Sequence, residues 1–292
     1  MRRGKPAPTH SAIILPSLHV VGQIRCMDRP TGAHRAPYPW RQRLAALVLL
    51  CHAGLRAAGA ALPGRCALCG ATGTHVLCTG CRQQFGAAAA VPRCPVCAEP
   101  VAEEATPTPC GRCLILTPAF DATVCAVDYA APFDQLVLGL KFGARLAHAP
   151  VLAALLRDAL LQNPRCQQTA LPELLAAVPL GRVRLRERGF NQALEIARPL
   201  AALMGTPLAP RLLVRQRDTK PQSLLTPEQR RHNLHDAFAL TPSLQDAVRD
   251  RHVGVIDDVM TTGATLDAIA TVLKQYGAAR VTNLVVARTA PP

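Results

Sequence analysis

The chain has 292 residues, 49% hydrophobic and only 3% aromatic, which is enough for one α/β domain with an aliphatic core and one small module. Its formal net charge of +14 indicates an anionic partner, such as a phosphorylated ligand, nucleic acid or anionic lipid. Twelve cysteines would suit a disulfide-rich secreted protein, but eight of them form Cys-x-x-Cys pairs. This spacing argues against a mesh of disulfides and predicts a cytoplasmic protein.

The N-terminal segment combines a basic tail with one apolar run. Residues 1–40 mix Pro, Gly, His and Arg without apolar periodicity, which predicts a disordered basic tail, and Met27 is an alternative start. Residues 41–62 predict an amphipathic helix, because their apolar residues fall at helical spacing. A secretory signal is the alternative, but polar residues interrupt the run early. The run is also too short to span a membrane, so no membrane span is expected.

Residues 63–116 predict a double zinc ribbon that needs metal to fold, because the segment is poor in apolar residues. Four thiolates complete a closed tetrahedral zinc site, so eight cysteines predict two structural sites. Sequential and interleaved pairing both satisfy this count, and the same spacing would also suit reduced thiols without metal or an iron–sulfur cluster. The predicted ligands are Cys66, Cys69, Cys78, Cys81, Cys94, Cys97, Cys110 and Cys113. A chelator is expected to unfold this module and leave much of the later domain folded.

Residues 120–290 predict an α/β domain, because apolar runs of strand length alternate with longer helical stretches. This alternation is typical of a mainly parallel sheet flanked by helices. The expected strands are 124–130, 174–178, 253–256 and 281–287, and the expected helices are 133–140, 150–161, 191–204 and 264–276.

A phosphate and ribose site is predicted where the strand at 253–256 ends. Backbone N–H groups at the start of a helix bind anions, threonine hydroxyls add donors, and Gly263 permits close approach. Asp257 and Asp258 would repel a bare phosphate, but they can accept hydrogen bonds from the vicinal hydroxyls of a ribose. Capping of the following helix is the alternative role for these acids. The predicted phosphate-binding loop consists of Thr261, Thr262, Gly263, Ala264 and Thr265.

The sequence from Val255 to Thr265, Val-Ile-Asp-Asp-Val-Met-Thr-Thr-Gly-Ala-Thr, resembles the binding signature for phosphoribosyl pyrophosphate in type I phosphoribosyltransferases. Over roughly residues 60–290 the chain is similar to the ComF family, which is associated with competence and the use of DNA. The cysteine pairs carry this resemblance together with three further motifs, Leu140–Gly143, Arg186–Gln192 and Gln222–Leu234.

The resemblance implies a type I phosphoribosyltransferase-like fold and a role for each matching residue. The two acids would hold the ribose, and the loop after them would hold the 5′-phosphate. The turn from Pro179 to Arg188 would face the pyrophosphate, with Arg186 and Arg188 as charge donors. A divalent ion, usually magnesium, would bridge pyrophosphate and ribose. For the arginines of this turn, a solvated surface is the alternative.

Two lysines are further candidates for substrate binding. Lys141 follows the helix at 133–140, and it either reaches the site or lies on the surface. Lys220 belongs to residues 215–233, whose loop composition predicts a lid over the substrate. Leu224-Leu-Thr226 stands where the family pattern has Gly-Leu-Ser, so the flexibility of this lid is in question.

Three functions fit these features. In a transferase, an acceptor displaces pyrophosphate from the anomeric carbon, and catalysis comes from stabilising charge and orienting the sugar. In a sensor, the same pocket binds phosphoribosyl pyrophosphate or a nucleotide without turnover. In the third function, basic loops and the ribbon handle single-stranded DNA, although the aromatic residues on which bases usually stack are scarce.

Overall fold

The computed structural model describes residues 64–74, 77–86, 92–101, 108–163, 170–216 and 237–289. Contacts divide the chain into two units, Met1–Ala57 and Ala58–Pro292, and all described residues belong to the second. The predicted tail, the predicted helix at 41–62 and most of the predicted lid, with Lys220, lie outside the described residues.

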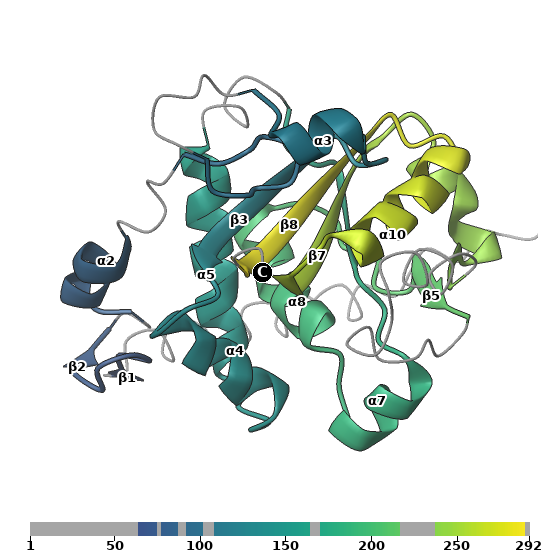
Figure 1. Ribbon diagram of the computed structural model, residues 1–292. Coiled ribbons are helices and arrows are strands. Elements are labelled where there is room, and N and C mark those ends of the chain that lie inside the picture. The colour runs from purple at the N-terminus through teal and green to yellow at the C-terminus, as the bar shows by residue number, and fades with distance from the viewer. Residues whose placement is uncertain are drawn as a thin grey trace, which may run out of the picture. The chain divides into compact units, whose positions relative to one another are not determined.

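A four-stranded parallel sheet forms the centre of the domain (Figure 1). Its strands are β3 (Ala122–Asp128), β8 (Arg280–Arg288), β7 (His252–Met260) and β4 (Leu174–Ala177), in that order, and all neighbours are parallel. The two central strands are buried along nearly their whole length, as expected for a sheet that is covered on both faces. The predicted fold class, a parallel sheet flanked by helices and preceded by a small cysteine-rich module, is confirmed.

Helices cover both faces of this sheet (Figure 1). α5 (His148–Gln162) packs on β3 and β8 and against α8 (Gln192–Met204), while α4 (Phe133–Lys141) packs on α5. α10 (Ala264–Gln275) packs on β8. The chain crosses the sheet in opposite directions from β3 to β4 and from β7 to β8, so right-handed connections place α5 and α10 on opposite faces. No helix of the described ranges is both long and apolar enough to cross a membrane.

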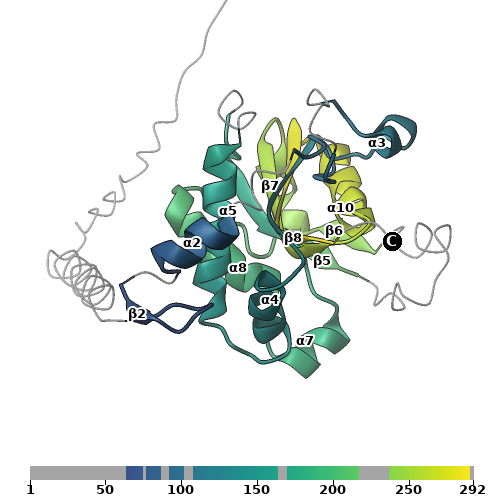
Figure 2. The same ribbon diagram turned by 60° about the vertical axis from the view of Figure 1, so that its left-hand side comes forward.

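The segment that was expected as a turn after β4, Pro179 to Arg188, contains a helix, α7 (Arg182–Arg188), so this expectation was wrong for its last seven residues. α7 has no buried residue, and it projects from the body of the domain in both views (Figures 1 and 2). Without a buried face it lacks the apolar periodicity by which a helix is recognised. Gly189 ends it in the left-handed conformation at φ 80°.

A short antiparallel pair flanks the position of the predicted lid. It consists of β5 (Leu213–Arg215) and β6 (Phe238–Leu240), and a 3₁₀ helix, η3 (Pro242–Val248), leads on to β7. The N–H of Gln216 donates a hydrogen bond to the carbonyl of Ala237 at 2.9 Å. Residues 216 and 237, which flank the position of the predicted lid, therefore lie next to each other at the end of the β5–β6 pair.

The cysteine-rich part consists of short elements (Figure 2). β1 (Gly64–Arg65) pairs with β2 (Thr72–Gly73), and two helices follow, α2 (Thr79–Gly86) and α3 (Gly111–Ile115). Five of its cysteines are buried in the same apolar cluster as the strands of the sheet. This part of the chain therefore shares its core with the α/β domain.

Candidate functional site

Eight cysteines form two groups of four, and within each group all four sulfur atoms lie within 4.8 Å of one another. The groups follow the sequence, with Cys66, Cys69, Cys78 and Cys81 in the first tetrad and Cys94, Cys97, Cys110 and Cys113 in the second. This grouping is the sequential one of the two pairings that the spacing left open.

Both tetrads fit tetrahedral zinc. The Sγ atoms of Cys69 and Cys78 lie 3.6 Å apart, as do those of Cys97 and Cys110. Four sulfurs at about 2.3 Å from one zinc ion would be about 3.8 Å from each other. With all four positions filled by protein, the metal has no place for a substrate, so its role is structural.

One thiol in each tetrad ionises readily. Burial raises the pKa of Cys66, but backbone N–H groups, among them that of Cys78 at 3.4 Å, outweigh it and lower the pKa to about 6. Burial and backbone hydrogen bonds likewise compete at Cys94, where the N–H of Cys110 donates at 3.2 Å and the pKa falls to about 7. Backbone donors therefore favour the thiolate form that binds metal.

The predicted phosphate-binding loop joins β7 to α10. Gly263 begins the helix with φ 82°, and a Cβ atom at this position would lie 2.5 Å from Cε of Met260. Glycine is favoured here because the positive φ is strained for other residues, and because a Cβ atom would require the end of the Met260 side chain to move. The first N–H groups of α10 have no partner within the helix, so the loop has the donors that an anion needs.

Asp257 and Asp258 lie side by side in β7, next to this loop. The N–H of Asp258 donates to Oδ1 of Asp257 at 2.9 Å, and the side chain of Asp258 is buried. Both acids lie inside the strand, and the N-cap of α10 is Gly263, so the helix-capping alternative is excluded.

Two cations reach Asp258 from the ends of helices. Nζ of Lys141, the last residue of α4, lies 3.2 Å from Oδ2 of Asp258, although this oxygen accepts no hydrogen bond. Arg188, the last residue of α7, has one buried guanidinium nitrogen without a partner in the described chain. Burial lowers the pKa of Arg188, while the charge of Asp258 acts in the opposite direction. Lys141 is therefore paired with the acids, and Arg188 lies near enough for its charge to interact with that of Asp258.

The charge of Asp257 is poorly stabilised. Removal from water raises its pKa well above the ordinary value, and the neighbouring Asp258 adds to this shift. Lys141 opposes the shift only in part. The acid pair thus has unused capacity to accept hydrogen bonds or to bind a cation.

The remaining predicted residues lie farther out or have other contacts. Arg186 is exposed on α7, and Pro179 is half-buried in the loop after β4. Sequence reasoning missed Asn191, whose side chain donates to the carbonyl of Val178 at 3.0 Å and accepts from the N–H of Ala193 at 3.1 Å. Asn191 caps α8 and ties it to the loop that carries Pro179. A polar residue directly before an apolar helix is the signal by which it could have been found.

Sequence reasoning also missed Arg288, at the end of β8. Its guanidinium is almost fully buried and donates to the carbonyls of Met260, Thr261 and Cys97 and to the carboxylate of Glu99. An arginine that directly follows a long apolar run is the one signal that the sequence offered, because arginine is rarely buried unless it is paired.

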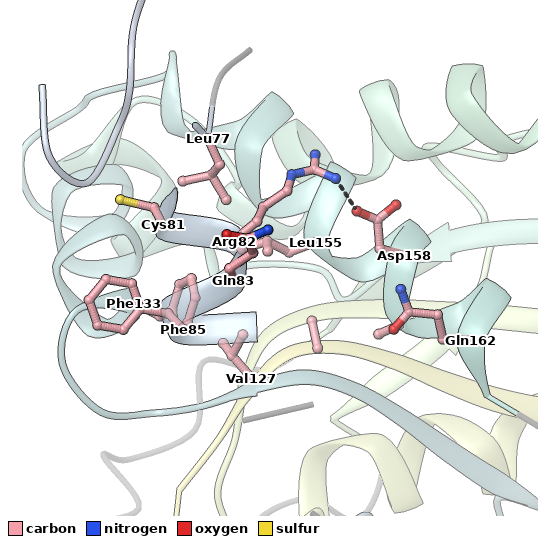
Figure 3. A pocket seen from close by; sticks show the side chains of 12 residues that line it. Leu77, Cys81, Arg82, Gln83, Phe85, Val127, Phe133, Leu155, Asp158 and Gln162 are labelled. Carbon is pink, nitrogen blue, oxygen red and sulfur yellow. Dashed lines mark hydrogen bonds and ion pairs between the residues drawn. The ribbon is translucent and has the colours of Figure 1, made fainter. Parts of the chain in front are cut away.

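A separate cavity of about 370 Å³ lies between α2, β3 and α5 (Figure 3). Apolar side chains such as Phe85, Phe133 and Leu155 line it, and Arg82 and Asp158 form an ion pair of 3.1 Å at its wall. None of the predicted substrate-binding residues lines this cavity. The acid pair and its loop therefore form a different site.

Comparison with known proteins matches residues 57–114 to the double zinc ribbon domain family. The DNA utilization protein YhgH of Escherichia coli (strain K12) is 34% identical over 231 residues, which cover 78% of this chain and 98% of that protein. Competence protein F of Haemophilus influenzae is 33% identical over 201 residues, which cover 69% of this chain and 85% of that protein.

Solved structures overlap only weakly. One is titled as the allosteric regulatory enzyme of purine biosynthesis, with 19% identity, a TM-score of 0.29, and coverage of 47% of this chain and 25% of that one. Another is a purine phosphoribosyltransferase from Pyrococcus horikoshii Ot3, with 16% identity, a TM-score of 0.25, and coverage of 55% and 74%. At these scores the overlaps support no conclusion, and the fold rests on the sheet itself.

Proposed function

Because the chain belongs to the ComF family, with the DNA utilization protein YhgH and Competence protein F as relatives, we propose that it binds phosphoribosyl pyrophosphate or a related ribose phosphate at the carboxyl end of β7. The observation that carries this proposal is the acid pair beside a helix-opening loop of N–H donors, with two cations at its edge. One site thus offers acceptors for sugar hydroxyls and donors for phosphate, which is the chemistry of a phosphorylated ribose.

The proposed roles follow from this arrangement. The N–H groups and hydroxyls of residues 261–265 hold the 5′-phosphate, and Asp257 and Asp258 accept hydrogen bonds from the ribose hydroxyls. Lys141 and Arg188, with the exposed Arg186 farther out on α7, face the pyrophosphate and stabilise the charge that it gains as it leaves. Lys220 would add a further positive charge.

Magnesium fits the same acids. Hard cations take oxygen ligands, and Oδ2 of Asp258 is a buried carboxylate oxygen without a hydrogen bond. When bound, the ion would neutralise charge between pyrophosphate and ribose. The acids would supply ligands, directly or through water, and Lys141 would then be free to contact phosphate.

Calorimetric titration with phosphoribosyl pyrophosphate and magnesium tests the proposal. We expect a micromolar Kd, equivalent to about −8 kcal/mol, for the wild type and for D246N, which removes an exposed acid on η3. The double variant D257A/D258A is expected to lose binding at least tenfold. A folded wild type that does not bind would refute the donor site, and retained binding in the double variant would refute the role of the acids.

Turnover is a separate part of the proposal. We propose transfer of the phosphoribosyl group to an acceptor, which labelled donor and a panel of nucleobases would test by the release of labelled pyrophosphate. Binding without release for any acceptor would favour the sensor. A cytoplasmic location remains a prediction, which cell fractionation would test.

Single-stranded DNA is the second candidate ligand, and one surface favours it. Phe142 is 71% exposed at the end of α4, and the guanidinium of Arg188 lies 5.3 Å from the centre of its ring. The other arginines of α7 are exposed nearby, so phosphate contacts and one stacking platform occur together. Anisotropy with a labelled oligonucleotide should show binding that weakens with salt and with F142A. Binding that is indifferent to salt would contradict this mechanism.

A further inference from the structure

Two arginines donate to three consecutive carbonyl groups, that of Met260 at the end of β7 and those of Thr261 and Thr262 in the phosphate-binding loop. Arg288 donates to the carbonyls of Met260, at 3.2 Å, and Thr261. Arg112, in α3 of the second ribbon, donates to the carbonyl of Thr262. The two arginines therefore bind the carbonyl oxygens of this segment and leave its backbone N–H groups free.

Because the arginines fix the direction of these carbonyls, peptide geometry also fixes the direction of the N–H groups. In a trans peptide the C=O of one residue and the N–H of the next point in opposite directions. Carbonyls 260, 261 and 262 face the two arginines, so the N–H groups of Thr261, Thr262 and Gly263 face away from them. Within the described ranges these three N–H groups have no acceptor, and successive free N–H groups are the kind of donor set that binds anions.

The second ribbon is what holds the arginines. Arg288 is 2% exposed, and it also donates to the carbonyl of the metal ligand Cys97 at 3.1 Å and to Glu99 at 2.6 Å. Arg112 lies between the metal ligands Cys110 and Cys113. Loss of the ribbon would leave the charge of Arg288 buried without its partner, which is costly.

The first ribbon makes no such contact in the described part of the chain. One of its arginines, Arg82 on α2, forms an ion pair with Asp158 of α5 at 3.1 Å, far along the sequence from the loop. The two ribbons therefore contact different parts of the domain.

We propose that the second ribbon positions the phosphate-binding loop, with Arg112 and Arg288 as positioning residues. The affinity of the loop for its anionic ligand then depends on the metal in the second tetrad and not on that in the first. The inference about affinity rests on the proposed function, whereas the inference about the order of the loop does not.

Hydrogen exchange and ligand binding on the full chain test this proposal together. R112A removes the hydrogen bond to the carbonyl of Thr262. E99Q removes the negative charge that pairs with Arg288 and keeps a side chain of the same shape as Glu99, and R82A is the matched control from the first ribbon. We expect faster exchange of the amides of residues 261–263, and a Kd for phosphoribosyl pyrophosphate raised about tenfold, in R112A and E99Q. R82A should match the wild type in both measurements. Wild-type exchange in R112A and E99Q, or an equal effect of R82A, would overturn the proposal.

A second comparison tests the metal. Cys110 and Cys78 are the third ligands of their tetrads and are equally half-buried, so C110S and C78S are matched. C110S is expected to loosen the loop more than C78S, and the ligand should strengthen metal binding at equilibrium at the second tetrad alone, by the factor with which the metal strengthens ligand binding. Equal effects of the two variants would overturn the proposal. If the wild type binds no ligand, the proposed function fails, while loop exchange still decides the positioning role.

Discussion

The substitution G263A measures how closely the loop is packed at the start of α10. A non-glycine residue at φ 82° costs about 1–2 kcal/mol. The added Cβ would also lie 2.5 Å from Cε of the buried Met260, and such overpacking costs about 1–3 kcal/mol. The flexible methionine end can move, so we expect the lower part of this range and a total of about 2–3 kcal/mol. For a unit of this size that lowers Tm by roughly 4–12 °C.

G205A is the matched control for G263A. Gly205 ends α8 at φ 65°, and a Cβ there would meet nothing within 4 Å, so only the conformational cost of about 1 kcal/mol applies. Thermal unfolding by circular dichroism should show a Tm fall of roughly 2–4 °C for G205A. Calorimetry should show at least tenfold weaker ligand binding for G263A and none of that loss for G205A. Equal losses of Tm in the two variants would refute the close packing of the loop.

Three further predictions concern charge and metal. The pKa of Asp257 is raised, so its ionised form destabilises the fold. Stability should fall as pH rises from about 4 towards the raised pKa, by up to about 1.4 kcal/mol per pH unit. Urea unfolding at about pH 5 and pH 8 should show a smaller difference in unfolding free energy for D257N than for the wild type. An unchanged difference would count against the role of Asp257. Burial lowers the pKa of His252, whose ring contacts the carbonyl of Ala170 at 3.0 Å and the hydroxyl of Thr282 at 2.7 Å. A loss of stability is therefore expected from His252 as pH falls below about 6.5, opposite in sign to the effect of Asp257, so it is measured in the D257N variant. Adding H252Q should abolish it, and a D257N midpoint that is constant between about pH 5 and 7 would contradict this. A chelator should empty the first tetrad, with its exposed Cys69, before the second, and the second loss should lower the Tm of the sheet more than the first. Simultaneous release, with one melting step, would contradict the difference.

The sheet and the loop were predictable because their signals are local. Strands that are buried on both faces must be apolar along their length, as β7 and β8 are, so they stand out as runs. The loop could be recognised by Gly263 between small residues, because few residues other than glycine adopt a positive φ. The grouping of the cysteines was not predictable, since both pairings satisfy the same spacing and only the fold chooses between them.

Other features depend on contacts between distant residues. α7 has no buried face, so no periodicity marks it, and β5 and β6 have only three residues each. Arg112 and Thr262 are 150 positions apart, and Glu99 and Arg288 are 189 apart. A contact across such a separation leaves no pattern in a single sequence, so the link between ribbon and loop appears only in three dimensions.

The position of β8 has a consequence for the synthesis of the protein. β8 is the last strand of the sheet in the sequence, yet it lies between β3 and β7, and Val281 bonds to Asp121 across 160 positions. At about 5–20 residues per second, a ribosome needs on the order of 10–30 s to cover that interval. During this time β3 has no neighbour in the sheet, and the second ribbon lacks Arg288. A chain that stops before residue 280 therefore exposes an unpaired apolar strand, which proteases and chaperones recognise.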